Sequence, residues 1–79
     1  MYYVYIIQSQ KDKSYYIGVS KNLKQRMKQH DWHLVKYSKS RAPFKLIWYS
    51  AFIDKNKAYD FEKYLKSGSG FAFRNKRLI

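Results

Sequence analysis

The sequence predicts an α+β fold of the order ββαβα, in which a small, mainly antiparallel three-stranded sheet is flanked by helices. Short runs rich in β-branched and aromatic residues indicate the strands, and apolar residues at helical spacing behind capping residues indicate the helices. The chain has 79 residues, which suffice for one hydrophobic core. We therefore expect a single domain over residues 1–79.

The strands are expected where the apolar runs are flanked by polar turns. Residues 2–9 and 15–19 should form an antiparallel hairpin, because only the polar turn at residues 10–14 joins them. After an irregular basic stretch at residues 32–43, the run FKLIWYSAF at residues 44–52 predicts a third strand.

Capping residues mark the start of each expected helix. Ser20 or Asn22 can cap a helix over residues 23–31, and Asp54 or Asn56 can cap a second one. The second helix should run to about Lys66 and be ended by Gly68.

The tail after the glycine-containing segment 67–70 is expected to add a further helical turn. Its aromatic residues Phe71 and Phe73 are the groups that we expect to pack it onto the domain.

The charge balance points to a polyanionic partner. Seventeen Lys and Arg residues against five Asp and Glu residues give a formal net charge of +12. Such an excess draws a protein to nucleic acid, mainly through phosphate contacts that release counterions. Nucleic acid is therefore the expected partner, and a membrane surface is the rival. DNA is expected ahead of RNA, although the net charge itself does not separate the two.

Other classes are excluded or disfavoured by composition. No segment approaches the ~20 consecutive apolar residues of a membrane span, and no basic region precedes the opening MYYVYIIQS to make it a signal peptide. The chain has no cysteine, which excludes disulfides, thiol chemistry and cysteine-based zinc sites. A cytoplasmic location is expected.

Two polar residues occupy the core-facing stripe of the first helix. The spacing that collects the apolar Leu23 and Met27 also collects Arg26 and His30, which lie one turn apart. One reading places them at the border of the core, with the arginine stem along its edge. The other reading makes them part of a site.

The second helix repeats this pattern with an acid. Ala58, Phe61 and Leu65 share their face with Glu62, the only glutamate of the chain. Because an unpaired buried carboxylate is costly, Glu62 should have a cation partner or a metal ion. Lys66 at i+4 and Arg26 are the structural alternatives to a metal.

The hairpin contributes tyrosines. Alternation along the strands lets Tyr5 and Tyr16 share one face, where two tyrosines are more often core than catalytic. Gly18, inside the second strand, indicates a bulge or a close backbone approach.

These residues resemble the GIY-YIG nuclease superfamily, and especially its small stand-alone bacterial members. Tyr3-Val4-Tyr5 stands in place of the Gly-Ile-Tyr triplet, and Tyr16-Ile17-Gly18 is an intact Tyr-Ile-Gly. The remaining functional positions of the family match, in order, Arg26, His30 and Glu62.

The chain departs from the family at two places. The first triplet lacks its glycine, and the family's asparagine, about a dozen residues after the glutamate, has no direct counterpart. Arg74 stands near that place and Asn75 just beyond it.

The resemblance implies hydrolysis of phosphodiester bonds by a metal-dependent endonuclease. Glu62 would hold one Mg²⁺ or Mn²⁺ ion, and Arg26 would stabilise charge on the phosphoryl group. Tyr5 would orient or deprotonate the attacking water, Tyr16 would contact the phosphate, and His30 would take a proton or steady the phosphate.

Basic residues outside this site are expected to follow the nucleic-acid backbone, or else to be ordinary solvated charges. They are Lys36, Lys39, Arg41, Arg74, Lys76 and Arg77. A domain this small lacks an accessory specificity domain, so three alternatives stay open: weak activity alone, a protein partner that supplies specificity, or recognition of DNA structure in place of sequence. The alternatives are a non-catalytic nucleic-acid-binding module with the same fold, and a protein- or membrane-surface module.

Overall fold

The structure is a computed structural model that describes residues 1–31 and 43–79, with the side chains of residues 1–28 and 43–79. It confirms the predicted α+β class and element order. The elements are β1 (Tyr2–Ser9), β2 (Tyr15–Ser20), α1 (Leu23–Asp31), β3 (Phe44–Phe52), α2 (Lys55–Leu65) and α3 (Gly68–Arg77). Among the described residues, no helix is long and apolar enough to cross a membrane.

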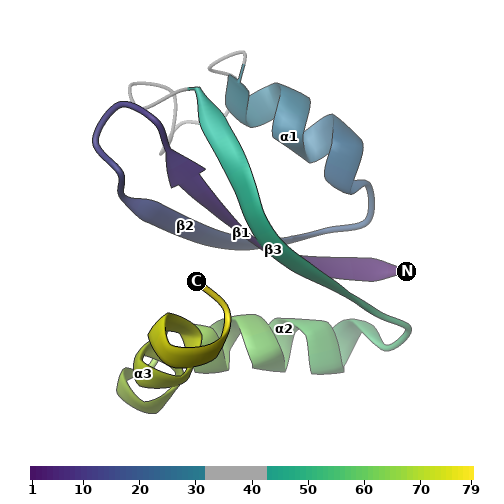
Figure 1. Ribbon diagram of the computed structural model, residues 1–79. Coiled ribbons are helices and arrows are strands. Elements are labelled where there is room, and N and C mark those ends of the chain that lie inside the picture. The colour runs from purple at the N-terminus through teal and green to yellow at the C-terminus, as the bar shows by residue number, and fades with distance from the viewer. Residues whose placement is uncertain (32–42) are drawn as a thin grey trace.

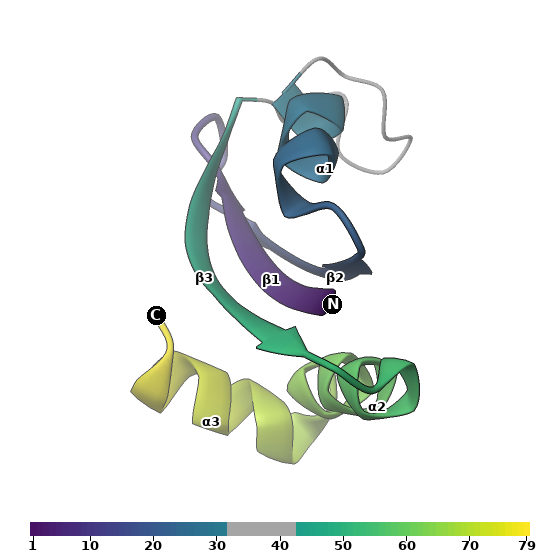
Figure 2. The same ribbon diagram turned by 90° about the vertical axis from the view of Figure 1, so that its right-hand side faces the viewer.

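The sheet has β1 in its centre, in the order β2-β1-β3, and both pairings are antiparallel. Helix α1 covers one face of the sheet, whereas α2 and α3 cover the other (Figures 1 and 2). The two helices that carry the predicted polar residues therefore lie on opposite faces.

Each face has its own apolar cluster, because alternate residues of β1 point in opposite directions. Val4 and Ile6 pack with Ala58 and Leu65 of α2. Tyr5 and Ile7, with Phe44, form the second cluster, against which Leu23 and Met27 of α1 pack. Strand β1 is thus buried on both sides and anchors the whole domain.

The helices begin where their caps satisfy backbone donors. Asn22 Oδ1 accepts from the Gln25 backbone N–H at 3.0 Å, so Asn22 caps α1. Asp54 accepts from the N–H groups of Asn56 and Lys57 and caps α2.

The C-terminal segment differs from the sequence expectation in two ways. Helix α2 ends at Leu65, and the glycine-containing segment starts a full ten-residue helix, capped by the Ser67 side chain. The expectation that Phe71 and Phe73 pack this tail onto the domain holds for one of the two rings. Phe73 lies against Tyr64 of α2, with ring centres 6.1 Å apart, whereas Phe71 is 52% exposed and contacts Arg74 of its own helix. The residues that α3 buries are Gly70 and Arg74.

Candidate active site

The centre of the candidate site is a contact between β1 and α1. Arg26 Nε donates a hydrogen bond to the Tyr5 hydroxyl oxygen at 3.3 Å. Tyr5 is only 2% exposed, and Arg26 is half-buried on the inward side of α1, as the helical spacing predicted. A phenol and a guanidinium therefore meet at the boundary of the core.

Gly18 makes room for this phenol. Tyr5 and Gly18 are partners in the β1–β2 register, and a Cβ atom at Gly18 would lie only 2.6 Å from Tyr5 Cζ. Since β2 is an edge strand, the absent side chain lets the Tyr5 hydroxyl extend across β2. The expected close approach at Gly18 is thus confirmed, and the group that approaches is the tyrosine ring.

The surroundings of Tyr5 keep its hydroxyl group protonated. Burial raises the pKa of Tyr5 above the ordinary value near 10, although the hydrogen bond and the charge of Arg26 lower it. The negative charge of Glu62 raises the pKa further. At neutral pH the phenol is therefore neutral and acts as a hydrogen-bond group, and the cation does not turn it into a ready base.

Glu62 acts on Tyr5 from the other side of the sheet. It lies on α2 with a side chain that is 20% exposed, and its neighbours Ala58 and Leu65 are fully buried. Its carboxylate oxygen lies 3.4 Å from Lys66 Nζ, which is the i+4 pair weighed above. Its charge is nonetheless close enough to influence the Tyr5 hydroxyl.

Tyr16 lies on the same sheet face as Tyr5, since its register partner is Ile7. Its ring packs edge-on against Phe44, with ring centres 5.4 Å apart. It also lines a hollow, together with Lys66, the C-cap residue of α2, and Arg74 of α3. The ring of Tyr16 therefore packs into the core, as one of the two readings expected, and Tyr16 also borders a surface hollow next to the Glu62–Lys66 pair.

Several predicted residues cannot be placed. His30 belongs to α1, one turn after Arg26, but its side chain lies outside the described part of the chain. The basic residues Lys36, Lys39 and Arg41 also lie outside the described residues.

The C-terminal basic residues divide into two kinds. Lys76 and Arg77 are exposed on α3, where they can meet a polyanion. Arg74 is only 8% exposed, and its guanidinium faces the rings of Phe71 and Tyr15 at 4.4 and 5.4 Å from their centres. Arg74 therefore joins α3 to β2, unlike the exposed backbone-tracking residue that we expected from the sequence.

The carboxylate of Glu62 suits a hard, partly hydrated cation. Across residues 1–28 and 43–79, no three His, Asp or Glu side chains gather into a protein cage. Glu62 offers a single, partly exposed carboxylate, and Mg²⁺ is commonly held by one or two carboxylates, with water and substrate phosphates as further ligands. Glu62 therefore fits as the protein ligand of one such ion.

A groove between α1 and the sheet was not predicted from the sequence. Two tyrosines on the α1 face line it, Tyr3 and Tyr49, together with the lysines beside them, Lys21, Lys24 and Lys28. The i,i+4 spacing of Lys24 and Lys28 was a visible signal. The pairing of β3 with β1, which places Tyr49 near Tyr3, left no such signal in the sequence.

The α+β scaffold, the hairpin tyrosines and the helix arginine that bonds Tyr5 are the features by which this chain resembles a nuclease-type domain. The GIY-YIG catalytic domain matches residues 1–76, so the chain belongs to the GIY-YIG family.

Its relatives are small bacterial proteins. The UPF0213 protein CPE1444 of Clostridium perfringens is 40% identical over 67 residues, which are 84% of this chain and 71% of that protein. The UPF0213 protein OB0043 of Oceanobacillus iheyensis is 35% identical, over 82% of this chain and 76% of that protein. The solution structure of the UPF0213 protein BH0048 of Bacillus halodurans has a TM-score of 0.59 and 30% identity, and the match covers 99% of this chain and 87% of that one.

Proposed function

We propose that this protein is an endonuclease that hydrolyses phosphodiester bonds in nucleic acid, DNA in the first place, with one Mg²⁺ or Mn²⁺ ion held by Glu62. The observation that carries the proposal is the hydrogen bond that joins the helix arginine to the buried hairpin tyrosine, while the carboxylate acts on that tyrosine by its charge alone. Arg26 bonds the Tyr5 hydroxyl, and the charge of Glu62 acts on that same hydroxyl. When bound, the ion would supply positive charge to the phosphoryl and leaving oxygens.

Arg26 would bind and stabilise the phosphoryl group that is attacked. Its guanidinium keeps its charge at any physiological pH and matches the geometry of two phosphate oxygens. Its Nε is already oriented by Tyr5. The remaining N–H groups of the planar fork would then stabilise the charge that develops on the phosphoryl oxygens.

Tyr5 would orient the attacking water and leave its deprotonation to another group. A phenol with a raised pKa keeps its proton at pH 7 and acts through hydrogen bonds. We assign the proton to His30, because histidine titrates near neutral pH. As the water oxygen bonds to phosphorus, the P–O ester bond breaks and the departing oxygen takes up a proton.

Supercoiled plasmid, branched DNA and single-stranded DNA incubated with Mg²⁺ or Mn²⁺ test this proposal. We expect Glu62→Gln and Arg26→Ala to abolish metal-dependent cleavage and to unfold at a temperature close to that of the unaltered chain. Asp60→Asn is a matched control, because Asp60 is an exposed acid on the same helix. Cleavage by Glu62→Gln at the rate of Asp60→Asn would refute the assignment.

One observation favours a second candidate, a nucleic-acid-binding module without catalysis. One oxygen of the Glu62 carboxylate, Oε2, is already paired with Lys66 Nζ at 3.4 Å, and this pair would compete with a metal ion for the carboxylate. The rival predicts salt-sensitive binding without any Mg²⁺-dependent product. The same incubation separates the two functions.

A further inference from the structure

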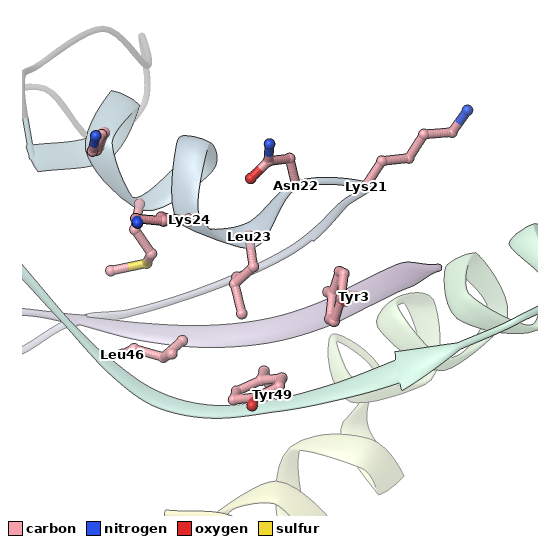
Figure 3. A pocket seen from close by; sticks show the side chains of 9 residues that line it. Tyr3, Lys21, Asn22, Leu23, Lys24, Leu46 and Tyr49 are labelled. Atoms are coloured by element: carbon pink, nitrogen blue, oxygen red, sulfur yellow. The ribbon is translucent and has the colours of Figure 1, made fainter.

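A groove lies between α1 and the sheet, on the side toward β3 (Figure 3). Tyr3 and Tyr49 contribute adjacent rings, with centres 6.2 Å apart and planes tilted by 58°. Figure 3 shows Leu23 pointing from α1 toward these rings. Tyr49 is 53% exposed although it lies mid-strand. The groove therefore offers a solvent-accessible aromatic ring in a partly apolar wall.

An irregularity in β3 builds this wall. Ile6 pairs with Trp48, whereas the next residue, Ile7, pairs with Leu46, so one residue of β3 is extra. The shift places both Leu46 and Tyr49 on the face that α1 covers, although an odd number of positions separates them. In a strand with regular alternation only one of these two side chains would face α1, so the irregularity adds a second apolar side chain to this wall.

The α1 side of the groove is lined with positive charge. Lys21 precedes the helix, and Lys24 and Lys28 lie one turn apart on it. Two like charges at i and i+4 repel each other. The first turn of α1 also contains no acid, although acids are favoured there. A polyanion along this line would relieve both unfavourable interactions.

We propose that this groove binds an unpaired nucleotide of the substrate, with its base against Tyr49 and its phosphates at Lys24 and Lys28. The inference rests on the proposed function and adds a binding site to it. The groove shares its face of the sheet with Tyr5 of the candidate active site, because Tyr49 is the register partner of Tyr5 and Tyr3 precedes Tyr5 by two residues. It lies toward β3, whereas the Tyr5 hydroxyl extends the other way, across β2. An intact duplex hides the faces of its bases, whereas an unpaired base can stack on an aromatic ring.

Fluorescence anisotropy with labelled single-stranded oligo-dT, measured in EDTA, tests the site without any cleavage. We expect Tyr49→Leu to weaken binding roughly tenfold or more, as the loss of one stacked base does. Tyr49→Phe should retain binding. Tyr59→Leu is the matched control, because Tyr59 is 46% exposed on α2, on the opposite face of the sheet.

The lysines have a matched control as well. The double variant Lys24→Gln/Lys28→Gln should weaken binding and reduce its salt dependence. The pair Lys55→Gln/Lys57→Gln removes the same charge from α2 and should have the smaller effect. The Tyr49 ring resonances should also shift upfield when oligo-dT is added to the unaltered chain.

The outcomes separate this site from the proposed function. Equal affinities of Tyr49→Leu and Tyr59→Leu would overturn the groove as a base site, even if Mg²⁺-dependent cleavage occurs. The same loss at Tyr49 with polyglutamate or anionic vesicles would also overturn it, because the groove would then not read a base. A Tyr49-dependent affinity for oligo-dT without any cleavage would support the groove and count against the endonuclease.

Discussion

The ring of Tyr5 occupies the space that a side chain at position 18 would need. Gly18 lies opposite Tyr5 in the β1–β2 register, and a Cβ atom there would lie 2.6 Å from Tyr5 Cζ. This relationship couples the Tyr-Ile-Gly triplet of the sequence to the hydrogen bond between Tyr5 and Arg26. The glycine is thus required by the position of the phenol.

We predict that Gly18→Ala displaces the Tyr5 ring and separates its hydroxyl from Arg26. The added methyl group should destabilise the fold by about 1–3 kcal/mol, as overpacking does, and should abolish most cleavage. Urea unfolding and a plasmid-nicking assay measure the two effects. Gly68→Ala is the control, because a Cβ there has no atom outside its immediate neighbours within 4 Å. Equal behaviour of the two variants would show that Tyr5 adjusts freely.

A second prediction concerns the titration of Tyr5. Since Arg26 lowers the pKa of Tyr5 and Glu62 raises it, Arg26→Ala should raise this pKa and Glu62→Gln should lower it. NMR of the tyrosine ¹³Cζ resonances, assigned with Tyr5→Phe, measures both shifts. A shift in the same direction for both variants would show that the two charges do not converge on this phenol.

The raised pKa of Tyr5 also sets the sign of a stability change at high pH. Above pH ~10 the unfolded chain loses this proton while the folded chain still holds it, so the free energy of unfolding falls. The loss should continue until pH passes the pKa of Tyr5 in the folded state. The unaltered chain should therefore lose more stability between pH 9 and 11 than Tyr5→Phe, in urea unfolding at each pH. Parallel curves for the two proteins would contradict this prediction.

The helical periodicity was enough to predict the inward faces of the helices. Helix α1 has the predicted bounds, and Arg26 and Glu62 lie on the half-buried sides of their helices. These are local properties, because the spacing of apolar residues along one helix fixes which side a core must cover.

Long-range contacts could not be predicted in this way. The burial of Arg74 depends on Tyr15, which lies far away in the sequence, and on the length of α3. The pairing of β3 with β1 is likewise set by packing of the whole sheet. From its charge alone we therefore expected Arg74 on the surface, and we did not predict the groove beside Tyr49.

A fourth prediction concerns the ion pair of Glu62. Lys66 competes with a metal ion for the carboxylate, so Lys66→Met should increase the affinity for Mn²⁺, measured by electron paramagnetic resonance. Stability should change by no more than about 0.5 kcal/mol, because Lys66 is 54% exposed and such helix pairs are weak. Lys63→Met, an exposed lysine of the same helix, is the control. Unchanged Mn²⁺ affinity in Lys66→Met would argue against Glu62 as the metal ligand.

A fifth prediction concerns the junction of α2 and α3, which holds Arg74 against Tyr15. A Cβ atom at Gly70 would collide with the Tyr64 carbonyl group and lie 2.8 Å from Leu65 Cα. Because backbone atoms cannot move aside as a flexible side chain can, Gly70→Ala should destabilise the domain by about 2 kcal/mol or more. It should also expose Arg74 and Leu78 to solvent. Gly68→Ala, two residues earlier in the same helix, should retain or increase stability, since alanine favours the helix and its Cβ meets no such obstacle. Urea unfolding of both variants measures the difference, and equal midpoints would mean that α3 can shift away from α2 without cost.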